Sequence, residues 1–165
     1  MIISVIGDSQ APPDISELAE QVGQELGKRG IVLVCGGLTG VMESACRGAK
    51  ATGGTTIGIL PGLDPAEANP WVDFPICTGL GHARNIIVVR SSVSVIAISG
   101  AYGTLSEIAY AKMDGIPIVG LHTWNEQQLS REWGEPRQYP QLWSVRNPVE
   151  AVEKAITEAS QRSLL

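Results

Sequence analysis

Short apolar runs alternate along this chain with longer stretches of helical periodicity, and this alternation limits the possible folds more than any other feature. The runs are rich in Val and Ile, as is typical of strands that are buried on both faces. The stretches between them repeat apolar residues at helical spacing. The alternation predicts a parallel sheet with right-handed crossovers and helices on both faces.

We therefore expect an α/β fold, a Rossmann-like three-layer sandwich with a mostly parallel sheet of about six or seven strands, in a single domain over residues 1–165. The expected strands are Ile2–Ile6, Ile31–Cys35, Thr55–Leu60, Phe74–Thr78, Val93–Ser99, Ile116–Leu121 and Leu142–Val145. The expected helices are Asp14–Lys28 with Asp14 as N-cap, Val41–Thr52, His82–Ser91, Gly103–Asp114 and a last helix that follows Asn147 and ends near Ser160. The irregular segment Thr123–Gln141 is interpreted as a surface excursion or a contact with another subunit.

A turn containing glycines joins the expected strand Val93–Ser99 to the following helix. Such a turn directs backbone N–H groups and the positive end of a helix dipole at one point, where a phosphate can bind. Gly100 and Gly103 let the backbone approach an anion closely, and Thr104 can add a hydroxyl donor. Glu107 places a carboxylate one helical turn further on. Thr104 and Glu107 also fit a capping box, so a purely structural role stays open.

Two further groups follow strands and are expected at the same edge of the sheet, because ligands of parallel sheets bind at the carboxyl ends of the strands. The candidate anion-binding residues of these groups are Gly36, Gly37, Thr39, Gly40, Arg84 and Asn85. Arg84 stands in the first turn of an expected helix, where a cation opposes the helix dipole. This placement indicates that Arg84 holds an anion, although an exposed arginine there would cost the helix only tenths of a kcal/mol.

Charge and motifs argue against several classes of function. The net charge is −5 without a long basic run, which gives nucleic-acid binding little electrostatic support. The glycine turns match neither the NAD fingerprint nor the P-loop. We expect no metal site, because His82 and His122 lack ligand spacing, and we expect His82 to be a packing or solvent-facing residue.

The block Gly7–Ser9 could begin a serine hydrolase, but the chain after His122 offers no histidine to complete such a site. We expect Ser9 and Gln10 to line the pocket or to cap a turn instead.

The three cysteines, Cys35, Cys46 and Cys77, form no C-x-x-C pair, and their number is odd. Cys35 and Cys77 lie in or at the ends of apolar strands, so we expect buried, reduced thiols. The apolar N-terminus is short and lacks a basic start, which is typical of a first strand and not of a signal peptide. No apolar run is long enough to span a bilayer. These features predict a cytoplasmic protein with neither a membrane nor a nucleic-acid partner.

Three motifs together resemble the LONELY GUY (LOG) superfamily, whose members are often mislabelled lysine decarboxylases. The motifs are G-G-x-x-G-V-M at Gly36–Met42, Arg84, and G-x-x-G-T-x-x-E at Gly100–Glu107. The resemblance implies a phosphoribohydrolase that cleaves cytokinin riboside 5′-monophosphate or AMP to free base and ribose 5-phosphate, with Glu107 and Arg84 as catalytic residues. The superfamily pattern begins P-G-G, whereas this chain has Ser99 and Ala101 in place of the proline and the second glycine.

A second branch of that superfamily fits more of the chain, from about Ile3 to Leu121. The motifs at Gly53–Gly62 and Thr78–Asn85 resemble the molybdenum cofactor carrier proteins and their uncharacterised bacterial relatives. This resemblance implies a homodimer or homotetramer of Rossmann-like subunits that holds a phosphate-bearing pterin without changing it.

We favour a binding or carrier protein for a small phosphorylated ligand, with no cofactor required. The molybdenum cofactor, or a related pterin or nucleotide monophosphate, is the first choice of ligand. The phosphoribohydrolase is the alternative, because a glycosidic bond needs a carboxylate near the anomeric carbon and Glu107 could supply one. A regulatory protein that senses a nucleotide is a third reading.

Overall fold

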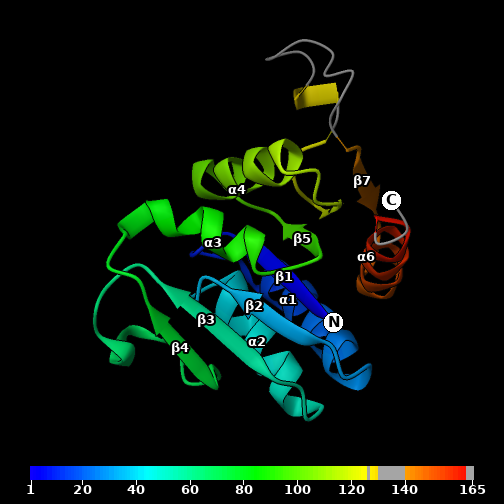
Figure 1. Ribbon diagram of the computed structural model, residues 1–165. Coiled ribbons are helices and arrows are strands. Elements are labelled where there is room, and N and C mark those ends of the chain that lie inside the picture. The colour runs from blue at the N-terminus through cyan, green and yellow to red at the C-terminus, as the bar shows by residue number, and fades with distance from the viewer. Residues whose placement is uncertain (126, 130–139, 163–165) are drawn as a thin grey trace.

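The computed structural model describes residues 1–125, 127–129 and 140–162, and these residues form a seven-stranded sheet covered by helices (Figure 1). The strands are β1 (Ile2–Gly7), β2 (Val32–Cys35), β3 (Thr56–Leu60), β4 (Phe74–Cys77), β5 (Ser94–Ile98), β6 (Ile118–Leu121) and β7 (Leu142–Val145). All neighbouring strands are parallel, in the order β4-β3-β2-β1-β5-β6-β7. The predicted Rossmann-like sandwich is therefore confirmed.

Helices cover both faces of the sheet and enclose a hydrophobic core on each face (Figure 1). The helices are α1 (Pro13–Lys28), α2 (Val41–Ala51), α3 (Asn85–Arg90), α4 (Tyr102–Met113) and α6 (Pro148–Arg162), with short 3₁₀ turns η1 (Pro65–Glu67) and η2 (Gly81–Arg84). One core lies between the sheet and α1, α2 and α6, and the other lies between the sheet and α3 and α4. Within the described residues, no helix has both the length and the apolar character needed to cross a membrane.

The order of the strands reverses between β1 and β5, and this reversal positions the site described below. From β1 the chain adds β2, β3 and β4 in one direction, whereas β5, β6 and β7 extend in the other. Gly7 and Ile98 are paired at the ends of β1 and β5, so the two strands end level with each other. The loops that follow them run to opposite sides, which leaves a crevice at the carboxyl ends of the strands.

Helices α1 and α2 pack so closely that glycine is needed on both. A Cβ atom at Gly23 would lie 2.0 Å from the carbonyl oxygen of Ala45, and one at Gly48 would lie 1.9 Å from that of Glu20. Neither backbone atom can move without shifting a whole helix. These contacts fix the position of α2, and therefore of the β2–α2 turn that precedes it.

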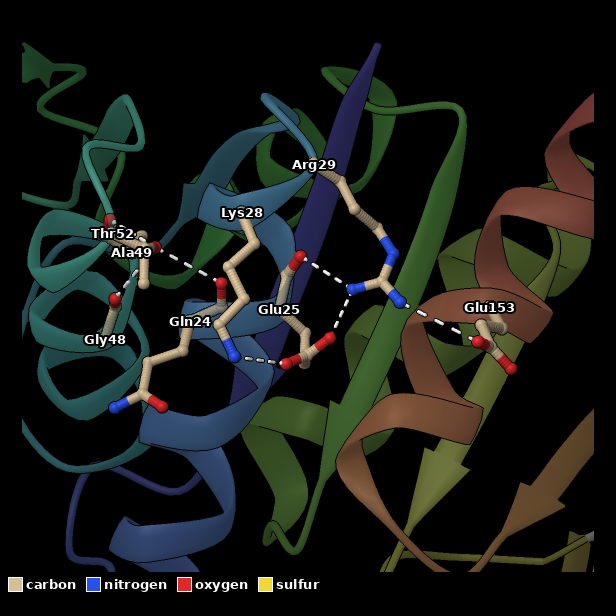
Figure 2. Close-up of polar contacts among 8 residues, drawn as sticks. All are labelled: Gln24, Glu25, Lys28, Arg29, Gly48, Ala49, Thr52 and Glu153. Atoms are coloured by element: carbon tan, nitrogen blue, oxygen red, sulfur yellow. Dashed lines mark hydrogen bonds and ion pairs between the residues drawn. The ribbon is translucent and has the colours of Figure 1, made fainter.

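Polar contacts hold the C-terminal end of α1 between α2 and α6, as Figure 2 shows. The Thr52 hydroxyl donates to the carbonyl oxygen of Gln24 at 3.2 Å. Arg29 pairs with Glu25 of its own helix, and its other terminal nitrogen lies 3.7 Å from a carboxylate oxygen of Glu153 in α6. The layer of three helices is thus joined at its surface as well as through its core.

Two helix starts differ from the sequence predictions. The prediction of Asp14 as N-cap is wrong, because α1 begins at Pro13 with Pro12 at the N-cap and no side-chain cap. Pro13 fits the first helical position because the N–H of that position has no partner within the helix. The predicted helix His82–Ser91 is split into η2 and α3. Gly79, in the turn before η2, and Gly81, its first residue, both have positive φ.

The prediction that the strand cysteines are buried is correct for Cys35 and wrong for Cys77. Cys35 is buried, as is Cys46, whereas Cys77 is only half-buried because β4 lies at the edge of the sheet. All three thiols are free. Most of the predicted excursion Thr123–Gln141 lies outside the described residues.

Candidate functional site

A cavity of about 230 Å³ lies at the carboxyl ends of the central strands, where the strand order reverses. Four segments of the chain line it: the end of β1 with the following loop, the β2–α2 turn, η2 with the start of α3, and the first two turns of α4. The cavity therefore lies at the edge that the sequence predicts for a ligand.

The N-terminal end of α4 opens into this cavity. Ala101 occupies the N-cap position without a side-chain cap, and the first helical hydrogen bond runs from the Leu105 N–H to the Ala101 carbonyl. The N–H groups of the first turn have no partner within the helix, and Gly103 and Thr104 of that turn line the cavity. The arrangement suits an anion. The capping-box alternative is wrong, because Thr104 stands inside the helix and not at its N-cap.

Arg84 is a buried cation at the junction of η2 and α3, with only 8% of its surface exposed. Its guanidinium lies against Gly36, where a Cβ atom would be 2.3 Å from the Nη2 atom. Its Nε–H has no hydrogen-bond partner among the described residues. Burial lowers the pKa of Arg84, and the nearby Glu107 charge opposes that change. A buried positive charge thus lines the cavity.

Glu107 stands in the second turn of α4 and is 6% exposed. Its carboxylate oxygen Oε1 lies 3.7 Å from Nη1 of Arg84, beyond hydrogen-bond distance. Burial raises the pKa of the Glu107 carboxyl to about 7, although the positive charge of Arg84 acts in the other direction. A carboxyl with such a pKa exchanges its proton near neutral pH, which is what a general acid or base requires.

The structure brings together some of the predicted site residues and keeps others out of the cavity. Those that line it are Gly36, Arg84, Asn85, Gly103, Thr104 and Glu107. Those that do not line it are Gly37, Thr39, Gly40 and Gly100. His82, which we expected to be a packing or solvent-facing residue, is exposed and lines the cavity.

The predicted residues outside the cavity have contacts of their own. The carbonyl of Gly37 accepts a hydrogen bond from the Asn69 side chain at 3.2 Å. The Thr39 hydroxyl donates to the carbonyl of Ser9 at 2.9 Å. Gly100 has φ +117°, a backbone conformation that only glycine adopts readily, and shapes the turn before α4. These residues support the segments that line the cavity, but they do not line it themselves.

Asn85 connects two of the lining segments. Its side-chain amide donates to the Ser106 hydroxyl at 3.0 Å and, more weakly, to the carbonyl of Gly103 at 3.4 Å. These bonds hold the start of α3 against the start of α4. Asn85 therefore keeps Arg84, its neighbour in the chain, close to the N-terminal end of α4.

Sequence reasoning missed several lining residues, of which Asp8 is the most informative. Asp8 and Ser9 follow β1 and line the cavity together with the apolar Leu38 and Met42. The expectation is that Ser9 and Gln10 line the pocket or cap a turn. Ser9 lines the cavity, whereas Gln10 does not, and the Gln10 N–H donates to the Asp8 carboxylate at 3.1 Å. The position of Asp8 directly after a central strand could have identified it.

A comparison with protein families identifies the chain. The model of the SLOG cluster4 family matches residues 1–152. The protein belongs to the SLOG cluster4 family. The resemblance to the LOG superfamily is therefore confirmed.

Solved structures similar to this SLOG cluster4 chain include two proteins described by their ligand. The molybdenum cofactor binding protein of the phototrophic bacterium Rippkaea orientalis is 39% identical, with a TM-score of 0.85 over 94% of this chain and 95% of that one. The molybdenum cofactor carrier protein of Chlamydomonas reinhardtii is 33% identical, with a TM-score of 0.81 over 94% and 98%. Both comparisons support the fold over nearly the whole chain.

A curated relative carries the name of an enzyme. The cytokinin riboside 5′-monophosphate phosphoribohydrolase of Mycobacterium tuberculosis is 32% identical over 129 residues, which are 73% of this chain and 69% of that protein. The SLOG cluster4 chain is thus similar both to cofactor-binding proteins and to a hydrolase.

The turn before α4 shows how this SLOG cluster4 chain departs from the P-G-G pattern of the hydrolases. Ser99 has φ +52°, a value that proline cannot adopt because its ring fixes φ near −65°. Ala101 is extended, with φ −110°, and an alanine there is unstrained. The departure at Ala101 therefore does not distort the backbone, whereas Ser99 gives the turn a shape that the proline would forbid.

Proposed function

We propose that the protein binds and carries a phosphorylated heterocycle in the cavity, with the molybdenum cofactor or a related pterin or nucleotide as its guest. The observation that supports this most is the buried Arg84 guanidinium, whose Nε–H lacks a partner among the described residues. A phosphate between Arg84 and the first turn of α4 would complete the hydrogen bonds of both groups.

The electrostatics of the cavity favour such a guest. A buried charge is costly unless it is paired and hydrogen-bonded, and the carboxylate near Arg84 stands 3.7 Å away. That carboxyl, with a pKa of about 7, is protonated in about half of the molecules at neutral pH. A phosphate would instead give charge-assisted hydrogen bonds, which are among the strongest in proteins.

The comparisons support a pterin as the heterocycle. The two similar structures from Rippkaea orientalis and Chlamydomonas reinhardtii are described as molybdenum cofactor binding and carrier proteins. Carrying such a ligand requires only donors for its phosphate and a complementary cavity. The first turn of α4 and Arg84 offer donors, and the cavity beside them has a volume of about 230 Å³.

A specific observation also favours the alternative, a phosphoribohydrolase acting on a nucleoside 5′-monophosphate. Glu107 is a buried carboxyl beside a cation, and it could stabilise an oxocarbenium-like transition state or orient water. Arg84 would then hold the 5′-phosphate or assist Glu107. The name of the mycobacterial relative agrees with this alternative.

We further propose that the protein acts in the cytoplasm as a homodimer or homotetramer. The exposed apolar side chains of edge strand β4, Phe74 at 58% and Ile76 at 47%, support association. The three free thiols fit a reducing compartment. Analytical ultracentrifugation of the full chain tests the association, and a monomer at micromolar concentration would contradict it.

One experiment separates the carrier from the hydrolase. The protein is incubated with AMP and with an N6-substituted adenosine monophosphate, and free base is measured by chromatography, while binding of a pterin phosphate is measured by calorimetry. We expect binding without release of base. Base release that disappears in Glu107→Gln would overturn the carrier in favour of the enzyme.

Substitution of Arg84 tests the site itself. Arg84→Ala should weaken binding of the phosphorylated ligand about tenfold or more, because charge-assisted hydrogen bonds are lost. Arg90→Ala is the matched control, since Arg90 ends the helix α3 that follows Arg84, is exposed and pairs with Asp114. Equal affinities of the two variants would overturn the placement of the phosphate, and an absence of any binding would overturn both functions.

A further inference from the structure

The loop after β1 places an aspartate at the cavity, beside the cation and the helix N-terminus that suit an anion. Asp8 is half-buried and lines the cavity together with Ser9, Arg84 and the first turn of α4. A carboxylate repels a phosphate, so Asp8 weakens the binding of the anion itself. Its presence there calls for a second interaction with the guest.

The backbone of this loop is held in place by the β2–α2 turn. The Val41 N–H donates to the carbonyl of Asp8 at 2.9 Å, and the Thr39 hydroxyl donates to the carbonyl of Ser9 at 2.9 Å. A Cβ atom at Gly40, where φ is +69°, would lie 2.3 Å from the carbonyl oxygen of Asp8. The glycine turn after β2 therefore holds the loop of Asp8 and Ser9, in addition to bringing Gly36 to the cavity.

The Asp8 carboxylate is itself oriented. Its Oδ1 accepts a hydrogen bond from the Gln10 N–H at 3.1 Å, which fixes the side chain over its own loop. In the described part of the chain, Oδ2 has no hydrogen-bond donor of its own. An ionised carboxylate only accepts hydrogen bonds, so Oδ2 can be satisfied by a donor group of a guest.

We propose that Asp8 selects the guest by accepting a hydrogen bond from a hydroxyl or amino group in the part of the ligand remote from its phosphate. Thr39 and Gly40 act as positioning residues for it. The proposal rests on the proposed function, because it assumes that a phosphorylated molecule occupies this cavity. The shared chemistry of the guests is an anion at one end and a neutral hydrogen-bond donor at the other.

Calorimetry on the full chain tests this with five probes: AMP, 2′-deoxy-AMP, 3′-deoxy-AMP, inosine monophosphate and inorganic phosphate. We expect the wild type to bind AMP about tenfold or more tightly than one of the three analogues, because a hydrogen bond to a charged group is lost. A weak deoxy analogue identifies a sugar hydroxyl as the donor, and a weak inosine monophosphate identifies the amino group of the base.

The Asp8→Asn variant should affect the affinities for AMP and for inorganic phosphate differently. The preference for AMP over the weak analogue should disappear, whereas inorganic phosphate should bind as tightly as before or more tightly, because a negative charge has been removed. Asp14→Asn is the matched control, since Asp14 is an exposed aspartate outside the cavity. Thr39→Val, which removes only the hydroxyl that holds Ser9, should reduce the AMP preference without weakening phosphate binding.

Two results would overturn the proposal. One is an Asp8→Asn variant that keeps the full preference for AMP. The other is a variant that loses affinity for every probe alike, inorganic phosphate included, which would mean a structural role. In either case, binding that still depends on Arg84 leaves the proposed function intact. If the wild type binds none of the five probes, the role of Asp8 in selecting a nucleotide fails, whereas the proposed function is decided by the separate measurement with a pterin phosphate.

Discussion

Arg84 and Glu107 stand 3.7 Å apart with less than a tenth of either side chain exposed, a separation too long for a hydrogen bond. The guanidinium is a cation and the carboxyl can become an anion, yet the two side chains form no hydrogen bond with each other. Burial raises the pKa of Glu107 to about 7 and lowers that of Arg84. This incomplete pairing has consequences that can be measured.

The stability of the protein should depend on pH through Glu107. Its carboxyl keeps its proton in the folded chain up to a pKa of about 7, whereas in the unfolded chain it ionises near the ordinary value of 4.5. Because the folded state binds more protons between these values, the free energy of unfolding falls as pH rises from about 4.5 to about 7. The loss attributable to this group is up to about 3 kcal/mol.

Urea unfolding of the wild type and of Glu107→Gln across this pH range measures the effect. The variant has no carboxyl to titrate, so the stability difference between the two proteins isolates Glu107 from other acids. Parallel curves for the two proteins would show that Glu107 is not the buried acid described above.

The close contact of Arg84 with Gly36 predicts a specific sensitivity. In Gly36→Ala the added methyl group would lie 2.3 Å from Nη2 and displace the guanidinium. We expect affinity for AMP or inorganic phosphate to fall about tenfold or more by calorimetry, because the charge no longer reaches the guest. A variant that retained wild-type affinity would contradict the role given to the placement of Arg84 against Gly36.

The close packing of α1 on α2 predicts a loss of stability when either glycine of the contact is enlarged. Gly23→Ala and Gly48→Ala introduce a methyl group within 2.0 Å of a backbone oxygen, so the helices must separate. We expect each variant to lose about 1–3 kcal/mol, measured by thermal unfolding. Gly103→Ala is the control, because a Cβ there meets no heavy atom within 4 Å and should leave stability almost unchanged.

The backbone of Ser99 predicts opposite effects for two substitutions. Ser99→Gly should stabilise the protein by about 1 kcal/mol, since glycine adopts φ +52° without strain. Ser99→Pro should cost about 3 kcal/mol or more, because the ring fixes φ near −65° and removes the N–H that donates to Leu121 at 3.1 Å. Chemical unfolding of both variants measures these changes in stability. A Ser99→Pro variant as stable as the wild type would contradict the positive φ of Ser99.

The elements of the fold could be predicted from the sequence, since buried strands and amphipathic helices leave strong periodic patterns. The sequence also predicted that the candidate site lies at the carboxyl ends of the strands, because Gly36 and Gly103 both come just after expected strands. The order of the strands could not be predicted, as it depends on which faces pack together in space. Helix starts were less certain because Pro12 and Asp14 both fit the beginning of α1.

The sequence could not show which structural role each glycine has. A glycine can admit a ligand or admit another part of the backbone, and the two uses look alike in a motif. Gly36 makes room for Arg84, whereas Gly40 makes room for the carbonyl of Asp8. A single aspartate in a loop gives no periodic signal, so only its position directly after β1 could have indicated Asp8.

The reversal of strand order between β1 and β5 means that the candidate site is assembled from two halves of the chain. Asp8 and Gly36 come from the half that contains β1 to β4, Thr104 and Glu107 come from the half that starts at β5, and Arg84 lies on the connection between them. A bound guest touches both halves, so part of its binding energy opposes their separation. Neither half alone holds a complete set of ligand contacts, and the occupied protein should unfold as one cooperative unit.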